Sequence, residues 1–246
     1  MSEAPLDLLV FGPHPDDLEI GMAGTIARYA AEGRRVGLCD LTRGEMGSNG
    51  SPEERVAEAD AAGAVLGAAV RINLGLPDGW MRPDDPEHVR IVAECIRRLR
   101  PRTIAAPYWR DRHPDHVTAS RLITHAAFKS GLRRYTTAAG EPWRADWVCY
   151  YFINNDAPPS FVVDVSAHYA RKREALACHR SQFAPAGVDA AATRLTSPLF
   201  AQLVETRDAQ FGARAGVQFA EGFIVREPLL RPNLLKPWPA QGPATP

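Results

Sequence analysis

The sequence lacks an excess of charge of either sign. Its 246 residues carry 29 lysines and arginines against 29 aspartates and glutamates, a formal net charge of +0. Such a balance produces no strong overall field that would attract nucleic acid or an anionic membrane surface. We therefore expect neither as a partner, and a small-molecule substrate fits the composition better.

Cysteine and long apolar runs are also scarce. The chain has 4 cysteines and no CxxC pair, which argues against a disulfide framework or a cysteine-rich metal site. The first apolar run, at residues 6–11, is too short to span a membrane, and no basic segment precedes it. These absences favour a cytoplasmic protein with reduced thiols and no targeting segment.

The length of the chain limits the number of domains. A chain of 246 residues with 45% hydrophobic content can build one large core, whereas two separate domains would each be small. Residues 231–246 are rich in proline and alanine, which is typical of a loose end. We predict one domain over residues 1–230, followed by a Pro-rich C-terminal tail at 231–246.

Apolar segments of strand length alternate with helix-like segments four times. The predicted strands are 6–11, 35–41, 70–74 and 103–106, and the helices that follow them are 18–32, 51–66, 85–99 and 116–129. Later in the chain we predict strands at 147–153, 161–165 and 221–225 and helices at 167–183 and 203–213. The repeated unit indicates a Rossmann-like α/β fold, a doubly wound, mostly parallel sheet of order 3-2-1-4-5 with helices on both faces.

Two clusters of histidine and aspartate follow the first and fourth predicted strands. They are His14-Pro15-Asp16-Asp17 and His113-Pro114-Asp115-His116. In a sheet of the predicted order these two strands are neighbours, and the crevice at their carboxyl ends is where such folds bind ligands. The two clusters are therefore expected to converge on one site.

The residue types in these clusters suit a catalytic zinc. Zinc binds imidazole nitrogen and carboxylate oxygen, and a catalytic zinc usually keeps three protein ligands, which His14, Asp17 and His116 can supply. The polar residues left for proton transfer and for stabilising charge are Asp16, His113 and Asp115. In the alternative interpretation His-Pro-Asp is only a turn in which Asp16 caps the following helix. Two such clusters at adjacent strand ends favour the metal site.

Both clusters and their surroundings also carry a resemblance. Residues 14–25 and 111–116 resemble the two signature motifs of the LmbE-like, or PIG-L, family of zinc-dependent N-acetylglucosamine deacetylases. Further segments resemble the branch that deacetylates N-acetylglucosaminyl-malate in bacillithiol biosynthesis: 42–45, 55–58, 74–78, 181–183 and 220–223. The resemblance covers about residues 6–225.

The resemblance implies a role for each matching residue. It implies one zinc per chain, with His14, Asp17 and His116 as ligands and Asp16 as general base. It implies that His113, oriented by Asp115, stabilises the tetrahedral intermediate. The substrate-binding residues that it implies are Arg55, Arg112 and Asp78. It also implies a homo-oligomer, often a hexamer in that family.

We therefore expect a metal-dependent amidohydrolase that removes the acetyl group from an N-acetylated amino sugar. Alternatives are a deacetylase of another N-acetylglucosamine compound, such as a chitobiose-type glycoside, and a non-catalytic metal-dependent sugar-binding protein. Iron or manganese could occupy the same nitrogen and oxygen ligands in place of zinc.

Overall fold

A seven-stranded sheet forms the centre of the molecule. The computed structural model describes residues 4–138, 140–186 and 190–230, and the predicted tail at 231–246 lies outside these ranges. The strands are β1 (Leu8–Gly12), β2 (Val36–Asp40), β3 (Val70–Asn73), β4 (Thr103–Pro107), β5 (Trp147–Tyr151), β6 (Phe161–Asp164) and β7 (Ala220–Ile224). Within the described residues their order is β3-β2-β1-β4-β5-β7-β6.

The first five strands are parallel and confirm the predicted order 3-2-1-4-5. Beyond β5, β7 pairs antiparallel with β5, and the edge strand β6 pairs antiparallel with β7. β1 and β2 are completely buried because each has a neighbour on both sides and helices above and below. Such strands appear in a sequence as continuous apolar runs.

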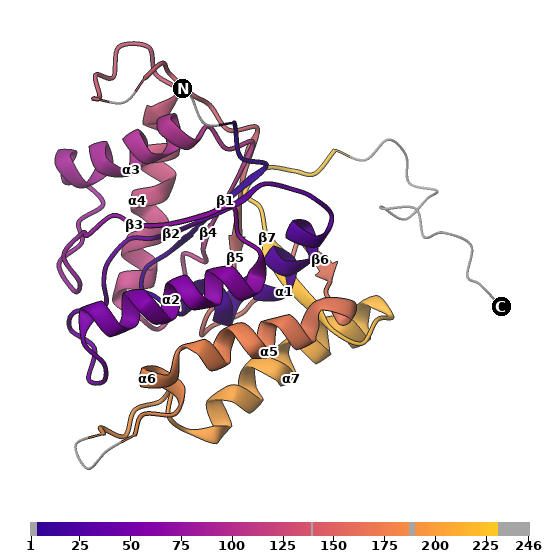
Figure 1. The fold of residues 1–246 in the computed structure, drawn as a ribbon. Coiled ribbons are helices and arrows are strands. Elements are labelled where there is room, and N and C mark those ends of the chain that lie inside the picture. Colours follow the sequence, from indigo (N-terminus) through magenta and orange to yellow (C-terminus); the bar gives the residue numbers. More distant parts are fainter. Residues whose placement is uncertain (1–3, 139, 187–189, 231–246) are drawn as a thin grey trace.

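Helices cover both faces of the sheet (Figure 1). They are α1 (Asp17–Ala31), α2 (Pro52–Leu66), α3 (Pro86–Leu99), α4 (Pro114–Ser130), α5 (Tyr169–Cys178), α6 (Arg180–Phe183) and α7 (Pro198–Ala215), with a 3₁₀ turn η1 (Ser166–His168) before α5. One core lies between the sheet and the α3–α4 layer, and another between the sheet and α1, α2, α5 and α7. No helix in the described part of the chain is long and apolar enough to cross a membrane.

Two of the predicted helices differ from those observed. The helix predicted at 167–183 is divided, because His179 has non-helical backbone angles and separates α5 from α6. The helix predicted at 203–213 begins earlier, at Pro198, where the Ser197 side chain accepts a hydrogen bond from the Leu199 N–H. Proline after a serine cap is a known start signal.

The sheet order places the two histidine clusters together. β1 pairs with β4, with Val10 opposite Ala105, so the loops that follow these two strands leave the same edge of the sheet. The loop after β1 leads into α1, and the loop after β4 leads into α4. The functional side chains are therefore supplied by two strand ends and two helix starts.

Candidate active site and metal centre

The two clusters, about a hundred positions apart in the chain, meet at the carboxyl edge of the sheet. The ring centroids of His14 and His113 are 5.1 Å apart, and those of His14 and His116 are 5.7 Å apart. The Nε2 atom of His116 lies 3.3 Å from Oδ1 of Asp17. The convergence expected from the sheet order is therefore present.

Three buried side chains form a group that could hold a metal ion. His14, Asp17 and His116 each offer one ligand atom, and these atoms all lie within 4.8 Å of one another. Two imidazoles and one carboxylate fit a zinc that keeps an open coordination position. A second group, made of His14, His113 and Asp115, shares His14, but its His113 is exposed.

Asp17 is held in the ionised form that metal binding needs. Burial alone would raise the pKa of Asp17, but His116 and His14 beside it lower that pKa well below its ordinary value. Oδ2 of Asp17 also accepts a hydrogen bond from the His14 backbone N–H at 3.0 Å. The carboxylate is thus fixed by its own loop before any ligand arrives.

Carboxylates hold the other side of each candidate histidine ligand. Nδ1 of His116 lies 3.1 Å from Oδ1 of Asp111, and Nε2 of His14 lies 3.0 Å from Oδ1 of Asp78 and 3.3 Å from Oδ2 of Asp115. A carboxylate on the second ring nitrogen fixes the tautomer and the orientation of a metal-binding imidazole. Asp78, expected to bind substrate, therefore lies buried against His14.

Asp111 is in turn fixed by Asn154. The backbone N–H and the side-chain amide of Asn154 donate to the two carboxylate oxygens of Asp111 at 2.9 and 3.0 Å. Neither residue is among the site residues predicted from the sequence. The sequence contained an indication of both residues. Asp111 is the first residue of the second motif, and Asn154 follows β5, the strand beside β4.

Asp16 has a strained backbone and a buried carboxylate. It is one of two non-glycine residues in the described chain with positive φ, at 124°, and its side chain makes no hydrogen bond to the start of α1. The alternative in which Asp16 serves as a helix cap is therefore wrong. Burial, partly offset by Arg55, raises the pKa of Asp16 to about 6. Strain of this kind gathers at functional sites.

Arg55 lies behind Asp16. Its Nη2 donates to Oδ2 of Asp16 at 3.2 Å and to the Pro15 carbonyl at 2.8 Å, and its Nη1 donates to the Gly44 carbonyl at 3.0 Å. The side chain is buried and still borders the cavity. We expected Arg55 to bind substrate. In the structure it donates hydrogen bonds to Pro15 and Asp16, in the loop after β1.

His113 is the N-terminal capping residue of α4 and is exposed, unlike Asp115 and His116. Its Nδ1 accepts a hydrogen bond from the Asp115 backbone N–H at 3.2 Å, and its ring stacks on that of His116. Burial and the positive charges of His116 and His14 lower the pKa of His113. The Asp115 carboxylate is bonded to His14 and to the Gly79 N–H, so Asp115 contacts His113 through its backbone.

These residues border a cavity of about 450 Å³ with a positive side. Arg112 and Arg194 both border it and are exposed. Burial and the nearby Arg112 charge lower the pKa of Arg194, and Nη1 of Arg194 donates to the Asn154 side-chain oxygen at 2.9 Å. Arg194 was not predicted, because it comes from the irregular segment before α7.

Comparison with known proteins gives the family. Residues 9–127, which include both clusters, match the family "PIG-L: GlcNAc-PI de-N-acetylase". A curated relative from Saccharomonospora viridis, 1D-myo-inositol 2-acetamido-2-deoxy-alpha-D-glucopyranoside deacetylase, is 30% identical in an alignment 227 residues long that covers 71% of this chain and 84% of that protein. A conserved protein of Thermus thermophilus has a solved structure that is 43% identical, with a TM-score of 0.83, covering 92% of this chain and 97% of that one.

Two more distant structures share the fold. N,N'-diacetylchitobiose deacetylase from Pyrococcus horikoshii is 23% identical with a TM-score of 0.76, covering 89% of this chain and 82% of that one. The 4-carboxy-2-hydroxymuconate hydratase from Pseudomonas putida is also 23% identical, with a TM-score of 0.73, covering 92% and 98%. One fold thus carries two reaction classes, and the family assignment rests on the closer matches. By these matches the chain belongs to the PIG-L family of de-N-acetylases, enzymes of the amidohydrolase class.

Proposed function

We propose that the protein is a zinc-dependent enzyme that removes the acetyl group from an N-acetylglucosamine conjugate. The observation that carries this proposal is the pairing of a buried three-ligand group, His14, Asp17 and His116, with a separate carboxylate, Asp16, beside it. A protein that only bound a sugar through a metal would not need that separate carboxylate. The strained backbone of Asp16 would then destabilise the fold without serving a function.

Zinc on these three residues would supply Lewis acidity, lowering the pKa of water and polarising the acetyl carbonyl. The donor set supports zinc, since all three groups are buried and are of the types that zinc takes. Asp111, Asp78 and Asp115 already hold the two histidines from behind, which supports a preorganised site.

Asp16 is proposed to take the proton from the attacking water. A pKa of about 6 leaves its carboxylate ionised at neutral pH and still basic enough to accept a proton. Arg55 holds the carboxylate in place, so we propose that Arg55 acts as a positioning residue. The proton that Asp16 takes up can then be passed to the departing amine.

His113 is proposed to stabilise the oxygen on which negative charge develops. With Nδ1 accepting from the Asp115 N–H, the ring can carry its proton on Nε2 and donate from there into the cavity that it borders. Burial, the largest cause of the lowered pKa of His113, favours this neutral form as the starting state. We therefore propose a neutral imidazole as the donor.

The proposed substrate is N-acetylglucosaminyl-malate, as in bacillithiol biosynthesis. Two arginines at the mouth of the cavity, Arg112 and Arg194, can pair with the carboxylates of a malate group. The Saccharomonospora viridis relative is named for an inositol conjugate, which carries no such charge. An inositol aglycone is therefore the alternative that a substrate comparison must include.

Acetate release tests the proposal. Zinc-loaded protein would be assayed with four compounds: N-acetylglucosaminyl-malate, the inositol conjugate, N,N'-diacetylchitobiose and free N-acetylglucosamine. We expect acetate and a free amine in equal amounts, and a rate lowered by ~10²- to 10⁴-fold in Asp16→Asn protein. Fully loaded protein that releases no acetate from any of the four would contradict deacetylation of these sugars.

A further inference from the structure

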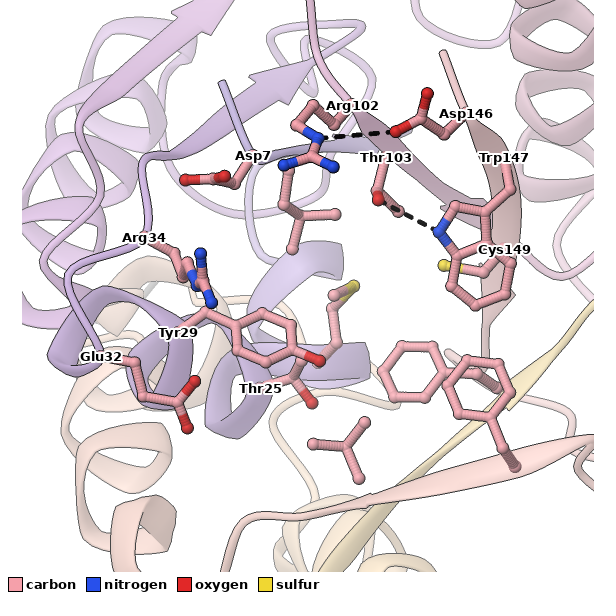
Figure 2. Close-up of a pocket in the computed structure, with 15 residues that line it drawn as sticks. Asp7, Thr25, Tyr29, Glu32, Arg34, Arg102, Thr103, Asp146, Trp147 and Cys149 are labelled. Carbon is pink, nitrogen blue, oxygen red and sulfur yellow. Dashed lines mark hydrogen bonds and ion pairs between the residues drawn. The ribbon is translucent and has the colours of Figure 1, made fainter. Parts of the chain in front are cut away.

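A second cavity, of about 470 Å³, lies at the edge of the sheet opposite the candidate active site. Figure 2 shows the residues that line it. Leu8, Thr103 and Trp147, the first residues of β1, β4 and β5, border it. The strands span about 16 Å from this edge to the carboxyl edge. The cavity is therefore separate from the site described above, and its size is in the range of small-molecule pockets.

One wall of this cavity is aromatic and rigid. Trp147 stacks on Phe161 with centroids 5.6 Å apart, and Phe161 stacks on Phe223 at 5.3 Å. The Trp147 indole N–H donates to Oγ1 of Thr103 at 3.1 Å, which fixes the ring (Figure 2). Met22 contributes a further apolar side chain to the lining. This wall suits a flat ring or a branched alkyl group.

Two residues of α1 with hydroxyl groups, Thr25 and Tyr29, border the cavity. They are four residues apart and therefore lie on one face of the helix. Thr25 is 2% exposed and its oxygen is not accessible, whereas Tyr29 is only partly buried. A polar group of a ligand would therefore pair with the Tyr29 hydroxyl.

Among the described residues, one arginine at the mouth of the cavity, Arg34, has no carboxylate partner. Three acidic residues stand there, and each has a partner: Asp7 accepts from the Arg35 N–H, Glu32 pairs with Arg28, and Asp146 pairs with Arg102. Arg34 also borders the cavity, and none of the described carboxylates lies within 4.0 Å of its guanidinium. An anionic group on a ligand can pair with it.

We propose that this cavity is a second ligand site, which takes a small amphipathic carboxylate. The apolar part packs on Trp147, Phe161 and Phe223, a polar atom reaches the Tyr29 hydroxyl, and the carboxylate pairs with Arg34. The proposal does not depend on the reaction at the other edge of the sheet. It assigns a use to the aromatic wall, the Tyr29 hydroxyl and Arg34 together.

Binding of 2-naphthoate to the zinc-loaded protein tests this site by calorimetry. We expect saturable binding with one molecule per chain, unchanged in Asp16→Asn protein, whose variant residue lies at the other edge. Arg34→Gln should weaken binding about 10-fold, which is 1.4 kcal/mol. Arg35→Gln removes a neighbouring exposed arginine that does not border the cavity, and it should leave the affinity unchanged. Methyl 2-naphthoate lacks the negative charge. Its affinity for the wild-type protein should therefore equal the affinity of 2-naphthoate for Arg34→Gln.

Further variants distinguish a ligand site from nonspecific binding and from a contact between protomers. Tyr29→Phe keeps the ring but removes the hydroxyl, and it should weaken binding of a 6-hydroxy derivative of the probe more than binding of 2-naphthoate itself. Equal affinities in the Arg34 and Arg35 variants, or no saturable binding, would overturn the proposal. The proposal would also be overturned if the probe never binds and sedimentation shows that Arg34→Glu dissociates an oligomer of the chain. The cavity would then be a contact between protomers.

Discussion

Nη2 of Arg55 donates to the Asp16 carboxylate at 3.2 Å, and the same atom donates to the Pro15 carbonyl at 2.8 Å. One guanidinium thus ties the backbone of the loop after β1 to the side chain proposed as the base. Asp16 has positive φ and no helix-capping bond, so Arg55 is the side chain that holds its carboxylate. A functional carboxylate and its support come from elements 39 positions apart.

Substitution of Asp16 is expected to lower turnover, whereas substitution of Asp17 is expected to lower zinc content. Asp16→Asn should keep zinc and lose turnover by ~10²- to 10⁴-fold, the contribution of general base catalysis. Asp17→Asn should lose zinc, because Asp17 belongs to the three-ligand group. Zinc content by elemental analysis, followed by kcat, checks this division. Equal zinc loss in the two variants would contradict it.

Arg55→Gln should lower kcat while zinc content stays near normal. The reason is that Asp16 would keep its carboxylate but lose the group that positions it. Arg55→Lys should retain more turnover than the glutamine variant, because it keeps a positive charge near Asp16. Arg133→Gln, at an exposed arginine beyond α4, serves as the control and should behave like wild type. A change in KM alone would instead support direct substrate binding by Arg55.

Asp111→Asn should weaken zinc binding without removing a ligand. Asp111 lies 3.1 Å from Nδ1 of His116 and is itself held by Asn154. Loss of such an orienting carboxylate typically costs about 10- to 100-fold in metal affinity. Competition with a fluorescent chelator measures the change. Affinity equal to wild type would show that the His116 ring is fixed by packing alone.

Much of the fold follows from patterns that lie close together in the sequence. Each of the first four β-α units is an apolar run followed by an amphipathic segment, and the right-handed connections of such units restrict the order of the parallel strands. The convergence of His14 and His116 followed from that order. The antiparallel pairing of β7 between β5 and β6 did not, since it depends on contacts between short strands far apart in the chain.

Side-chain partners were harder to foresee than side-chain types. His179 sits in a helix-like stretch with no partner at ligand spacing, yet it is fully buried and lies 3.2 Å from Glu19 of α1. The strain at Asp16 also has no local signature, because Asp before a helix normally predicts a cap. The His179 contact depends on a residue brought in by another element, which single-sequence patterns do not contain.

Lys172 should be important for stability because it is completely buried between two carboxylates. Its Nζ lies 2.7 Å from Oδ2 of Asp208 and 2.7 Å from Oε1 of Glu221. Lys172→Met leaves Glu221 without its cation and Asp208 with Arg207 alone, and loss of one partner from a buried ion pair costs about 3–5 kcal/mol. Urea unfolding measures the loss.

The neighbouring Arg173 provides a matched control for Lys172. Arg173 pairs with Glu205, but both side chains are about half exposed, and surface pairs of this kind contribute little. Arg173→Met should therefore leave the free energy of unfolding nearly unchanged. If the two methionine variants lost equal stability, the buried network would not be the cause.

The charge at the mouth of the active-site cavity should decide between the candidate substrates. We expect kcat/KM for N-acetylglucosaminyl-malate to exceed that for free N-acetylglucosamine by at least ~10-fold, which needs only about 1.4 kcal/mol of transition-state binding. Arg112→Gln and Arg194→Gln should each reduce this preference, because each removes a cation that can pair with malate. Added salt should reduce it as well, since both arginines are exposed and their pairing is screened.

The inositol conjugate is the control for this substrate prediction, because its aglycone is uncharged. Its kcat/KM should change little in Arg112→Gln or Arg194→Gln and little with salt. An inositol conjugate that is cleaved faster than the malate conjugate would remove the bacillithiol assignment and leave the zinc deacetylase proposal in place. Acetate release from both conjugates, with equal efficiency and no effect of either arginine, would show that the cavity recognises the N-acetylglucosamine unit alone.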